Sequence, residues 1–188
     1  LEVGLRALQQ KELDTVLVAA IDLQGDPRSL EHLPRPRGQA RPFEATSQGA
    51  SVGEGAVALV LKRLADCTAE DKVYAVIRGY GSASGGQALD MSPSPEAQGL
   101  AIFRAHHEAA TTPQQVTYVE AFGSGVSAED QAELAVLQAW YGPGSAPCAL
   151  GSLTAHSGLT GACSGLLSLA KAAAALSTRQ LPPLAGFE

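Results

Sequence analysis

The sequence lacks several features that mark common classes of protein. It has no cluster of lysine and arginine, and its 13 basic residues are outnumbered by 19 acidic ones, for a net charge of −6. That balance argues against DNA or RNA as a main partner. Its three cysteines, Cys67, Cys148 and Cys163, form no C-x-x-C pair and have no histidine spacing suited to zinc. We therefore expect neither a metal site nor a disulfide framework, and we expect the protein to lie in the reducing cytoplasm.

Long apolar runs and aromatic side chains are also scarce. No run approaches the roughly 18 residues of a membrane span, and we expect no signal peptide. Only 5% of the residues are aromatic, whereas 45% are hydrophobic and 20 are glycine. This composition is typical of a tightly packed α/β protein built from small side chains rather than of a disordered chain.

Two stretches carry the strongest pattern. From Val116 to Val126 an apolar run with alternating β-branched residues gives way to a glycine pair, and Ser127 then opens a helical pattern, which predicts a strand, a tight turn and a helix. From Gly151 to Gly165 a second short strand leads into an almost uncharged helix. Because the carboxyl ends of parallel strands face one crevice, we expect both stretches to meet at one site, with Phe122 in it.

These two stretches resemble the β-ketoacyl synthase (condensing enzyme) family of fatty-acid and polyketide synthases. The family's first turn typically reads H-G-T-G-T followed by P-L-G-D-P-I-E, and here it reads Phe122-Gly-Ser-Gly-Val, with Asp130 and Glu133 matching. The second typically reads G-S-V-K-S-N-I-G-H-T-E-A-A-A-G. Its matching residues are Gly151, Ser152, Gly158, Thr160, Ala162 and Gly165, and its departures are Thr154, His156 and Leu159.

Two further regions strengthen the resemblance. Arg41-Pro-Phe-Glu-Ala and Gly53-Glu-Gly-Ala are similar to the family's R-P-F-D-A and G-E-G-A, and the end from Leu181 is similar to L-P-P-T-L-H-F. The resemblance implies an α/β, thiolase-like layered fold with mixed, mostly parallel sheets and a buried helix layer. Residues 1–70 would end its N-terminal half and residues 71–188 would form its C-terminal half. The chain would then be the C-terminal part of the domain, with the nucleophilic cysteine upstream of Leu1.

The departures fall on the chemistry. Family members use two histidines to stabilise the developing enolate and thioester oxyanion, and Phe122 and Leu159 stand at those positions, with Thr154 in place of a lysine. Losing one oxyanion donor costs on the order of 10²–10³ in rate, so losing both predicts negligible condensation. We therefore expect an inactive ketosynthase-like chain, similar to the chain-length factors of polyketide and polyunsaturated fatty-acid synthases.

That resemblance implies partners and a cavity, and no cofactor. The partners would be an active ketosynthase in a heterodimer, or a second copy in a homodimer, together with an acyl carrier protein and an acyl or polyketide chain. The acyl pocket would be lined by Phe122, Ser124 and Leu159. Two alternatives stay open: an active acyltransferase or condensing enzyme whose site is rearranged around His156, and a purely structural docking module of a synthase.

Three motifs suggest other chemistry. Gly123-x-Gly125-x-x-Ala128 satisfies a Rossmann fingerprint, but no acid follows about 20 residues on, around Pro143 to Leu150, to hold a ribose. The Gly79-Tyr-Gly-Ser-Ala-Ser-Gly-Gly stretch lacks the Lys-Ser/Thr ending of a phosphate-binding loop. Gly161-Ala-Cys163-Ser-Gly165 matches the sequence pattern of a nucleophile elbow. Cys163 lies well inside a helical pattern that runs to Leu176, however, so we expect it to be a small buried hydrophobic residue rather than a nucleophile.

The remaining patterns predict the scaffold. We expect helices over 1–10, 95–110 and 128–141, a strand over 14–22 covered on both faces, and strands over 56–61 and 74–78. Residues 25–41 read as an exposed connection that includes His32. The side chains expected to face the core are Leu100, Phe103, Leu134, Leu137 and Tyr141. At the helix ends we expect two solvated histidines, His106 and His107, and two acids with a structural role, Asp130 and Glu133.

Overall fold

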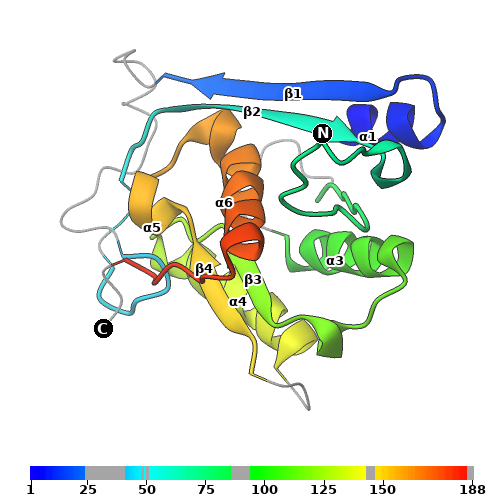
Figure 1. Ribbon diagram of the computed structural model, residues 1–188. Helices are drawn as coiled ribbons and strands as arrows, with labels where there is room; N and C mark the ends of the chain where they lie inside the picture. The colour runs from blue at the N-terminus through cyan, green and yellow to red at the C-terminus, as the bar shows by residue number, and fades with distance from the viewer. Residues whose placement is uncertain (24–40, 48, 50, 86–93, 143–146, 186–188) are drawn as a thin grey trace.

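The structure is a computed structural model that describes residues 1–23, 41–47, 49, 51–85, 94–142 and 147–185. Helices and two small sheets alternate along the chain, and one helix, α6 (Ser164–Thr178), runs through the middle of the molecule (Figure 1). The predicted connection over residues 25–41, with His32, lies almost entirely outside the described residues.

The first sheet is antiparallel. Helix α1 (Glu2–Gln9) precedes strand β1 (Thr15–Asp22), which pairs with β2 (Gly55–Lys62) so that Thr15 lies opposite Lys62. Exposure alternates along both strands, so the described residues leave one face of this sheet open. The prediction that the 14–22 strand is covered on both faces, as in a parallel sheet, was therefore wrong: apolar side chains on both faces do not ensure that both faces are covered.

The second sheet is parallel and positions the candidate site. Strand β3 (Tyr118–Ala121) pairs with β4 (Ala149–Ser152), and the register sets Ala121 opposite Ser152. Helix α4 (Ser127–Tyr141) follows β3, and the one-turn helix α5 (Thr154–Ser157) follows β4. The predicted sequence of strand, turn and helix after Val116 is confirmed. The described residues also include three short 3-10 segments: η1 (Leu64–Asp66) after β2, η2 (Pro113–Gln115) before β3 and η3 (Gly161–Cys163) before α6.

Helix α6 joins the two sheets because it packs against both β2 and β3. The short segment just before α6 is tied to the first sheet, since the backbone N–H of Ala162 donates to the carboxylate of Asp22 at 2.7 Å. The sequence predicted a helix buried on nearly all sides, whereas most of its side chains are half-buried and Leu176 is exposed. The apolar composition of this helix therefore predicted more burial than the described residues provide.

The segment 71–85 contains no strand among the described residues, so the strand predicted over 74–78 was wrong. A β-branched run becomes a strand only when a neighbouring backbone completes its hydrogen bonds. Here the backbone of the glycine-rich stretch instead lies directly on helix α3 (Pro95–Ala109). A Cβ at Gly81 would come within 2.0 Å of the carbonyl oxygen of Ala101, so glycine is needed for this close contact.

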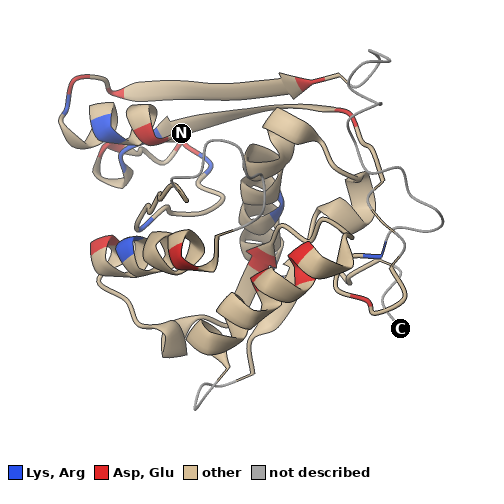
Figure 2. Cartoon of the chain, turned by 180° about the vertical axis from the view of Figure 1, so that it is seen from behind, with Lys and Arg blue, Asp and Glu red and all other residues tan. Residues whose placement is uncertain are grey.

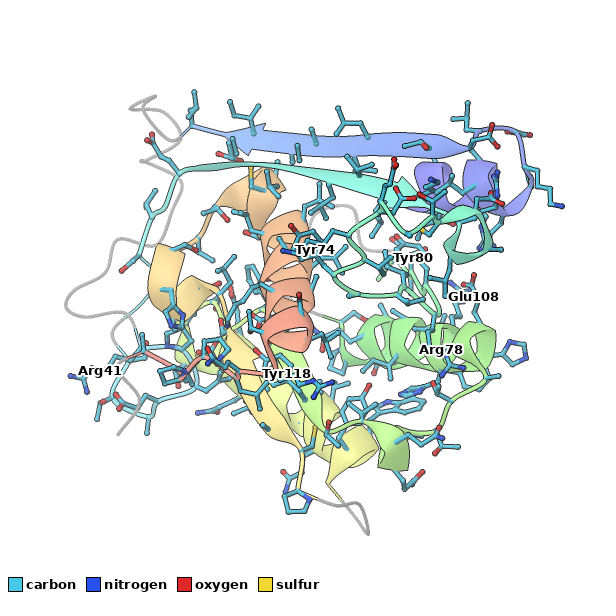
Figure 3. All side chains as sticks on the ribbon, in the orientation of Figure 1. Arg41, Tyr74, Arg78, Tyr80, Glu108 and Tyr118 are labelled. Atoms are coloured by element: carbon cyan, nitrogen blue, oxygen red, sulfur yellow. The ribbon has the colours of Figure 1, made fainter. Side chains whose placement is uncertain are left out.

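Alanine, rather than larger side chains, forms the inner face of α3. Leu100 and Phe103, which were predicted to face inward, are exposed, whereas Ala101 and Ala105 meet the glycine-rich segment. Tyr80 of that segment donates its backbone N–H to Glu108 at 3.0 Å, and the two residues lie close together in Figure 3. The glycines thus serve helix packing here, which supplies a structural reason for the motif.

The predicted solvation of His106 was wrong. Its Nδ1 lies 2.9 Å from the hydroxyl of Thr111, its Nε2 lies 3.3 Å from that of Tyr141, and its ring stacks on Trp140. The histidine joins the ends of α3 and α4, a tertiary contact that its place in the last helical turn does not reveal. Within the described part of the chain, no helix is both long and apolar enough to cross a membrane.

Candidate functional site

The turn that follows β3 meets the start of α5. The carbonyl oxygen of Phe122 accepts hydrogen bonds from the hydroxyls of Ser152, at 2.7 Å, and Thr154, at 2.8 Å. The parallel pairing of β3 with β4 brings these residues together, as the sequence predicted for the two strand ends. Thr154, at a position where the resemblance places a lysine, is therefore a buried residue that holds the backbone of residue 122.

A carboxylate fixes the same turn from its other side. The N–H groups of Phe122 and Gly123 each donate to one oxygen of Glu133, both at 2.9 Å. The peptide groups of Phe122 are thus held by three hydrogen bonds, while the residue as a whole remains 48% exposed. Burial raises the pKa of Glu133, the two N–H donors oppose that shift, and nearby Asp130 adds to it.

The second acid of α4 holds a neighbouring segment against the turn. Buried Asp130 accepts hydrogen bonds from the backbone N–H of Phe43 at 2.8 Å and of Gly125 at 3.2 Å. The hydroxyl of Ser124, itself buried, also lies 3.3 Å from this carboxylate. Asp130 and Glu133 thus hold the backbone of the turn, which is a more specific structural role than the helix-end position predicted.

The glycines of the turn are required by its shape. Gly123 and Gly125 have positive φ angles of 57° and 81°, and a Cβ at Gly123 would lie 2.8 Å from the hydroxyl oxygen of Ser152. A Rossmann turn needs its N–H groups free for a pyrophosphate. Here Glu133 and Asp130 accept from those of Phe122, Gly123 and Gly125, so the turn is built for internal contacts rather than for a dinucleotide.

Leu159 lies on a loop that is fastened to the segment before β2. Its N–H donates to the carbonyl oxygen of Ser51 at 2.7 Å, and its own carbonyl accepts from Gly53 at 2.9 Å. A Cβ at Gly53 would come within 1.9 Å of the Ser157 carbonyl oxygen, so the glycine of the Gly-Glu-Gly-Ala motif permits this contact. The two motif regions that carry the family resemblance therefore form one assembly.

The acyl-pocket lining by Phe122, Ser124 and Leu159 stays a prediction. Two surface hollows formed by described residues have volumes of about 510 and 490 Å³, and none of these three side chains lines either of them. His156, the possible substitute catalytic group, is exposed on α5, and its Nδ1 lies 3.4 Å from the carbonyl oxygen of Ser152. Among the described residues this long contact, to the last residue of β4, is the hydrogen bond that its ring makes.

A charged cluster between β3 and α6 was not predicted from the sequence. The ammonium of Lys171 lies 2.9 Å from a carboxylate oxygen of Glu120, and the hydroxyl of Tyr118, which Figure 3 labels, donates to the same carboxylate. The side chains of Lys171 and Glu120 are only 12% and 7% exposed. Burial and the Glu120 carboxylate strongly raise the pKa of Tyr118. The available signal was an acid within an apolar strand and a lysine within an almost uncharged helix.

Cys163 cannot act as a surface nucleophile in this arrangement. It is fully buried, and its thiol donates to the carbonyl oxygen of Gly55 at 3.0 Å. It ends η3 immediately before α6, so the prediction that it lies well inside the helix was wrong, although its burial was predicted correctly. Among the described residues no group of three or more histidine, cysteine, aspartate or glutamate side chains is arranged to hold a metal ion.

Comparison with known families accounts for this assembly. The family model described as beta-ketoacyl synthase, C-terminal domain, matches residues 74–188, and that of the N-terminal domain matches residues 1–67. The chain belongs to the β-ketoacyl synthase family. Its relatives include a phenolphthiocerol/phthiocerol polyketide synthase of Mycobacterium tuberculosis, 35% identical over 94% of this chain, and the mycocerosic acid synthase-like polyketide synthase of Mycolicibacterium smegmatis, 34% identical over 94%.

Solved ketosynthases share the fold. The ketosynthase from module 6 of the bacillaene synthase of Bacillus subtilis is 30% identical, with a TM-score of 0.91 over the whole of this chain. A protein titled PfaC Keto synthase-Chain length factor is 28% identical, with a TM-score of 0.88 over 99% of the chain. The thiolase-like layered fold inferred from the sequence is thereby confirmed. The chain spans 36% of that bacillaene ketosynthase and about a tenth of the polyketide synthases named above.

Proposed function

We propose that this chain is part of a non-catalytic, chain-length-factor-like ketosynthase of a polyketide or fatty-acid synthase. In this role it pairs with an active ketosynthase and shapes the cavity for the acyl chain. One observation carries the proposal: phenylalanine and leucine stand at the two positions where the family's histidines act, on a backbone that is fully hydrogen-bonded.

The chemistry of those side chains supports inactivity. Decarboxylative condensation needs hydrogen-bond donors directed at the oxygen where negative charge develops. Phe122 and Leu159 offer hydrocarbon, and Thr154 directs its hydroxyl at a backbone carbonyl. Since removing one such donor costs on the order of 10²–10³ in rate, the loss of both leaves little activity for any cysteine elsewhere in the domain to use.

The related structures support the proposed partnership. The fold alone does not separate the two roles, because the bacillaene ketosynthase and the ketosynthase-chain length factor protein match this chain about equally well. The difference therefore has to come from side chains, and here those at residues 122 and 159 are apolar. On this basis we propose an active ketosynthase, an acyl carrier protein and a growing acyl chain as partners, in the cytoplasm.

The test is a malonyl-thioester decarboxylation assay on the synthase polypeptide or complex that contains this chain. We expect no turnover above background from this site, and we expect Leu159→Ala and His156→Ala to leave that background unchanged. Clear turnover that is abolished by either substitution would overturn the proposal. As a companion measurement, Phe122→Ala should alter the length of the product made by the active partner, because it changes the size of the predicted pocket.

The exposed ring of His156 defines the second candidate, an active acyltransferase with a rearranged site. It lies on the same short helix as Thr154, whose hydroxyl contacts Phe122. Acyl loading of the protein, seen as a mass increase that disappears in His156→Ala, would favour it. Dimer formation with no bound acyl chain, and no effect of Phe122→Ala on product length, would instead favour a structural docking module.

A further inference from the structure

The larger of the two hollows described above lies between helices α1 and α3. We call it the α1–α3 hollow; its volume is about 510 Å³, and residues 80–82 of the glycine-rich segment form its third wall. Figure 1 shows this segment between the two helices, and Figure 2 shows charged residues on both of them. The volume is typical of small-molecule sites. The described residues that line the hollow include none from the candidate site, so its chemistry is a separate question.

Side-chain hydrogen bonds tie the three walls of this hollow to one another. Glu108 of α3 accepts from the side-chain amide of Gln9 on α1, at 2.9 Å, and from the backbone N–H of Tyr80, at 3.0 Å. The hydroxyl of Ser82 donates to Glu2 of α1 at 3.3 Å. Each wall is thus fixed to the other two, so a ligand meets a hollow that is already formed and loses little free energy in ordering it.

Two arginines bring positive charge to the hollow from different helices. The guanidinium of Arg104 on α3 donates through one nitrogen to the carbonyl oxygen of Ser82, and its other nitrogens have no hydrogen-bond partner among the described residues. Arg6 on α1 lies 3.9 Å from the carboxylate of Glu2, too far for a hydrogen bond, and its side chain is 53% exposed. Both guanidinium groups therefore have donors to offer a ligand.

The two acids beside the hollow are less available than the two arginines. Both carboxylate oxygens of Glu108 already accept hydrogen bonds from the scaffold. Glu2 and Arg6 form an exposed ion pair at long distance, and such a pair contributes little to stability. An incoming anion can therefore replace Glu2 beside Arg6 at small cost, whereas a cation finds the carboxylate of Glu108 already occupied.

Aromatic rings give the hollow an apolar wall. Phe103 is 53% exposed, and its ring centroid lies 6.0 Å from that of His107. Both residues line the hollow from the same helix as Arg104, and Tyr80 lines it from the glycine-rich segment. A planar guanidinium group binds a carboxylate or phosphate through two parallel hydrogen bonds, and exposed rings pack against flat apolar groups. The lining therefore matches an acid that is carried on a flat apolar body.

We propose that the α1–α3 hollow binds a small organic oxyanion, a carboxylate or a phosphate monoester attached to a flat apolar group. Arg6 and Arg104 hold the anion from two helices with charge-assisted hydrogen bonds, and Phe103 packs on the apolar group. A neutral ligand of the same shape would leave both guanidinium donors without an acceptor. This inference goes beyond the proposed function and does not depend on whether the candidate site is catalytic.

The test measures binding of phenyl phosphate, by ligand-observed NMR, to the synthase polypeptide or complex that contains this chain. We expect a Kd on the order of 1 mM, which is typical of a ligand of this size. Arg6→Gln and Arg104→Gln should each weaken binding about fivefold or more, because each removes a charge-assisted donor. Arg179→Gln, at an exposed arginine just after α6, is the matched control and should leave the Kd unchanged.

Glu2→Gln distinguishes a loss of binding from a loss of folding. Removing this negative charge leaves Arg6 without a competing acid, so phenyl phosphate should bind about two- to fivefold more tightly, a change that misfolding does not produce. Phe103→Ala should weaken binding of phenyl phosphate and leave that of inorganic phosphate unchanged. Benzoate in place of phenyl phosphate shows which acid the hollow prefers, and binding of either one supports the proposal.

Three results would overturn the inference. The first is a Kd for phenyl phosphate that neither Arg6→Gln nor Arg104→Gln changes, which would place the ligand elsewhere. The second is equally tight binding of benzyl alcohol, which would show that the apolar contact alone drives binding. The third is no binding of phenyl phosphate or benzoate at concentrations about tenfold above the expected Kd. Turnover at the candidate site, or its absence, bears only on the proposed function.

Discussion

At the scale of single residues, the backbone of Phe122 is held by hydrogen bonds, whereas its side chain makes none. Sequence patterns predicted the turn and the residues that meet there. They did not predict that the hydroxyls of Ser152 and Thr154 share the Phe122 carbonyl, because the partner of a hydroxyl depends on tertiary geometry. The assignment of Asp130 and Glu133 as structural acids followed from the sequence, but their backbone partners did not.

The raised pKa of Glu133 predicts a pH dependence of stability. A carboxyl whose pKa is higher in the folded than in the unfolded protein contributes most to stability below its unfolded pKa, near 4.5, and loses that contribution as pH rises through the folded pKa. Unfolding in denaturant at several pH values should therefore show the wild type losing stability relative to Glu133→Gln above about pH 4.5. A constant difference, or one of opposite sign, would contradict the assignment.

Gly151 offers a sharp packing test. A Cβ at this position in β4 would lie 2.1 Å from the hydroxyl oxygen of Tyr118, which is itself hydrogen-bonded to Glu120. We expect Gly151→Ala to lower the free energy of unfolding by about 1–3 kcal/mol, the usual cost of overpacking. Gly165→Ala is the control: nothing lies within 4 Å of its added methyl group, so it should stabilise α6 by about 0.5–1 kcal/mol. Equal effects would refute this view.

At the scale of elements, helix α6 and strand β3 are joined by a buried charged cluster. Sequence patterns found the helices over 95–109 and 127–141 to within a residue or two. They failed over 74–78, where a strand-like sequence has no strand partner among the described residues, and on α3, where Leu100 and Phe103 face outward. Local patterns identify elements, but neighbours decide pairing and which face is buried.

Removing one member of the Glu120–Lys171 pair should be costly. Lys171→Met leaves the Glu120 carboxylate buried with the Tyr118 hydroxyl as its remaining partner among the described side chains, so we expect a loss of about 3–5 kcal/mol in denaturant unfolding. Replacing both members, with Glu120→Leu and Lys171→Met together, should recover most of that loss because no unpaired charge remains. A double variant as unstable as the single one would show that charge pairing is not the cause.

At the scale of the whole molecule, one central helix connects two sheets. The family resemblance predicted the thiolase-like layered fold, and the comparisons confirm it. The antiparallel pairing of β1 with β2, and the face of this sheet that the described residues leave open, were not predicted, since both depend on the relative placement of distant segments. The division of the chain at about residue 70 stays a prediction.

The position of α6 predicts that the two sheets unfold together. Because α6 packs on both β2 and β3, and Asp22 of β1 binds the η3 segment just before it, loosening the helix at one sheet should be felt at the other. Amide exchange measured on Lys171→Met should therefore show faster exchange in β1 and β2 as well as in β3. Unchanged protection of β1 and β2 would instead mean that each sheet is an independent unit.

The three hydrogen bonds around residue 122 all involve its main chain and none its side chain. Gene duplicates of such a domain can therefore exchange the group displayed at this position through a few nucleotide changes and keep the surrounding architecture. Under the proposed role of residue 122, gain and loss of catalysis would then be neighbouring steps in sequence space, and a synthase would acquire a silent companion domain without a new fold.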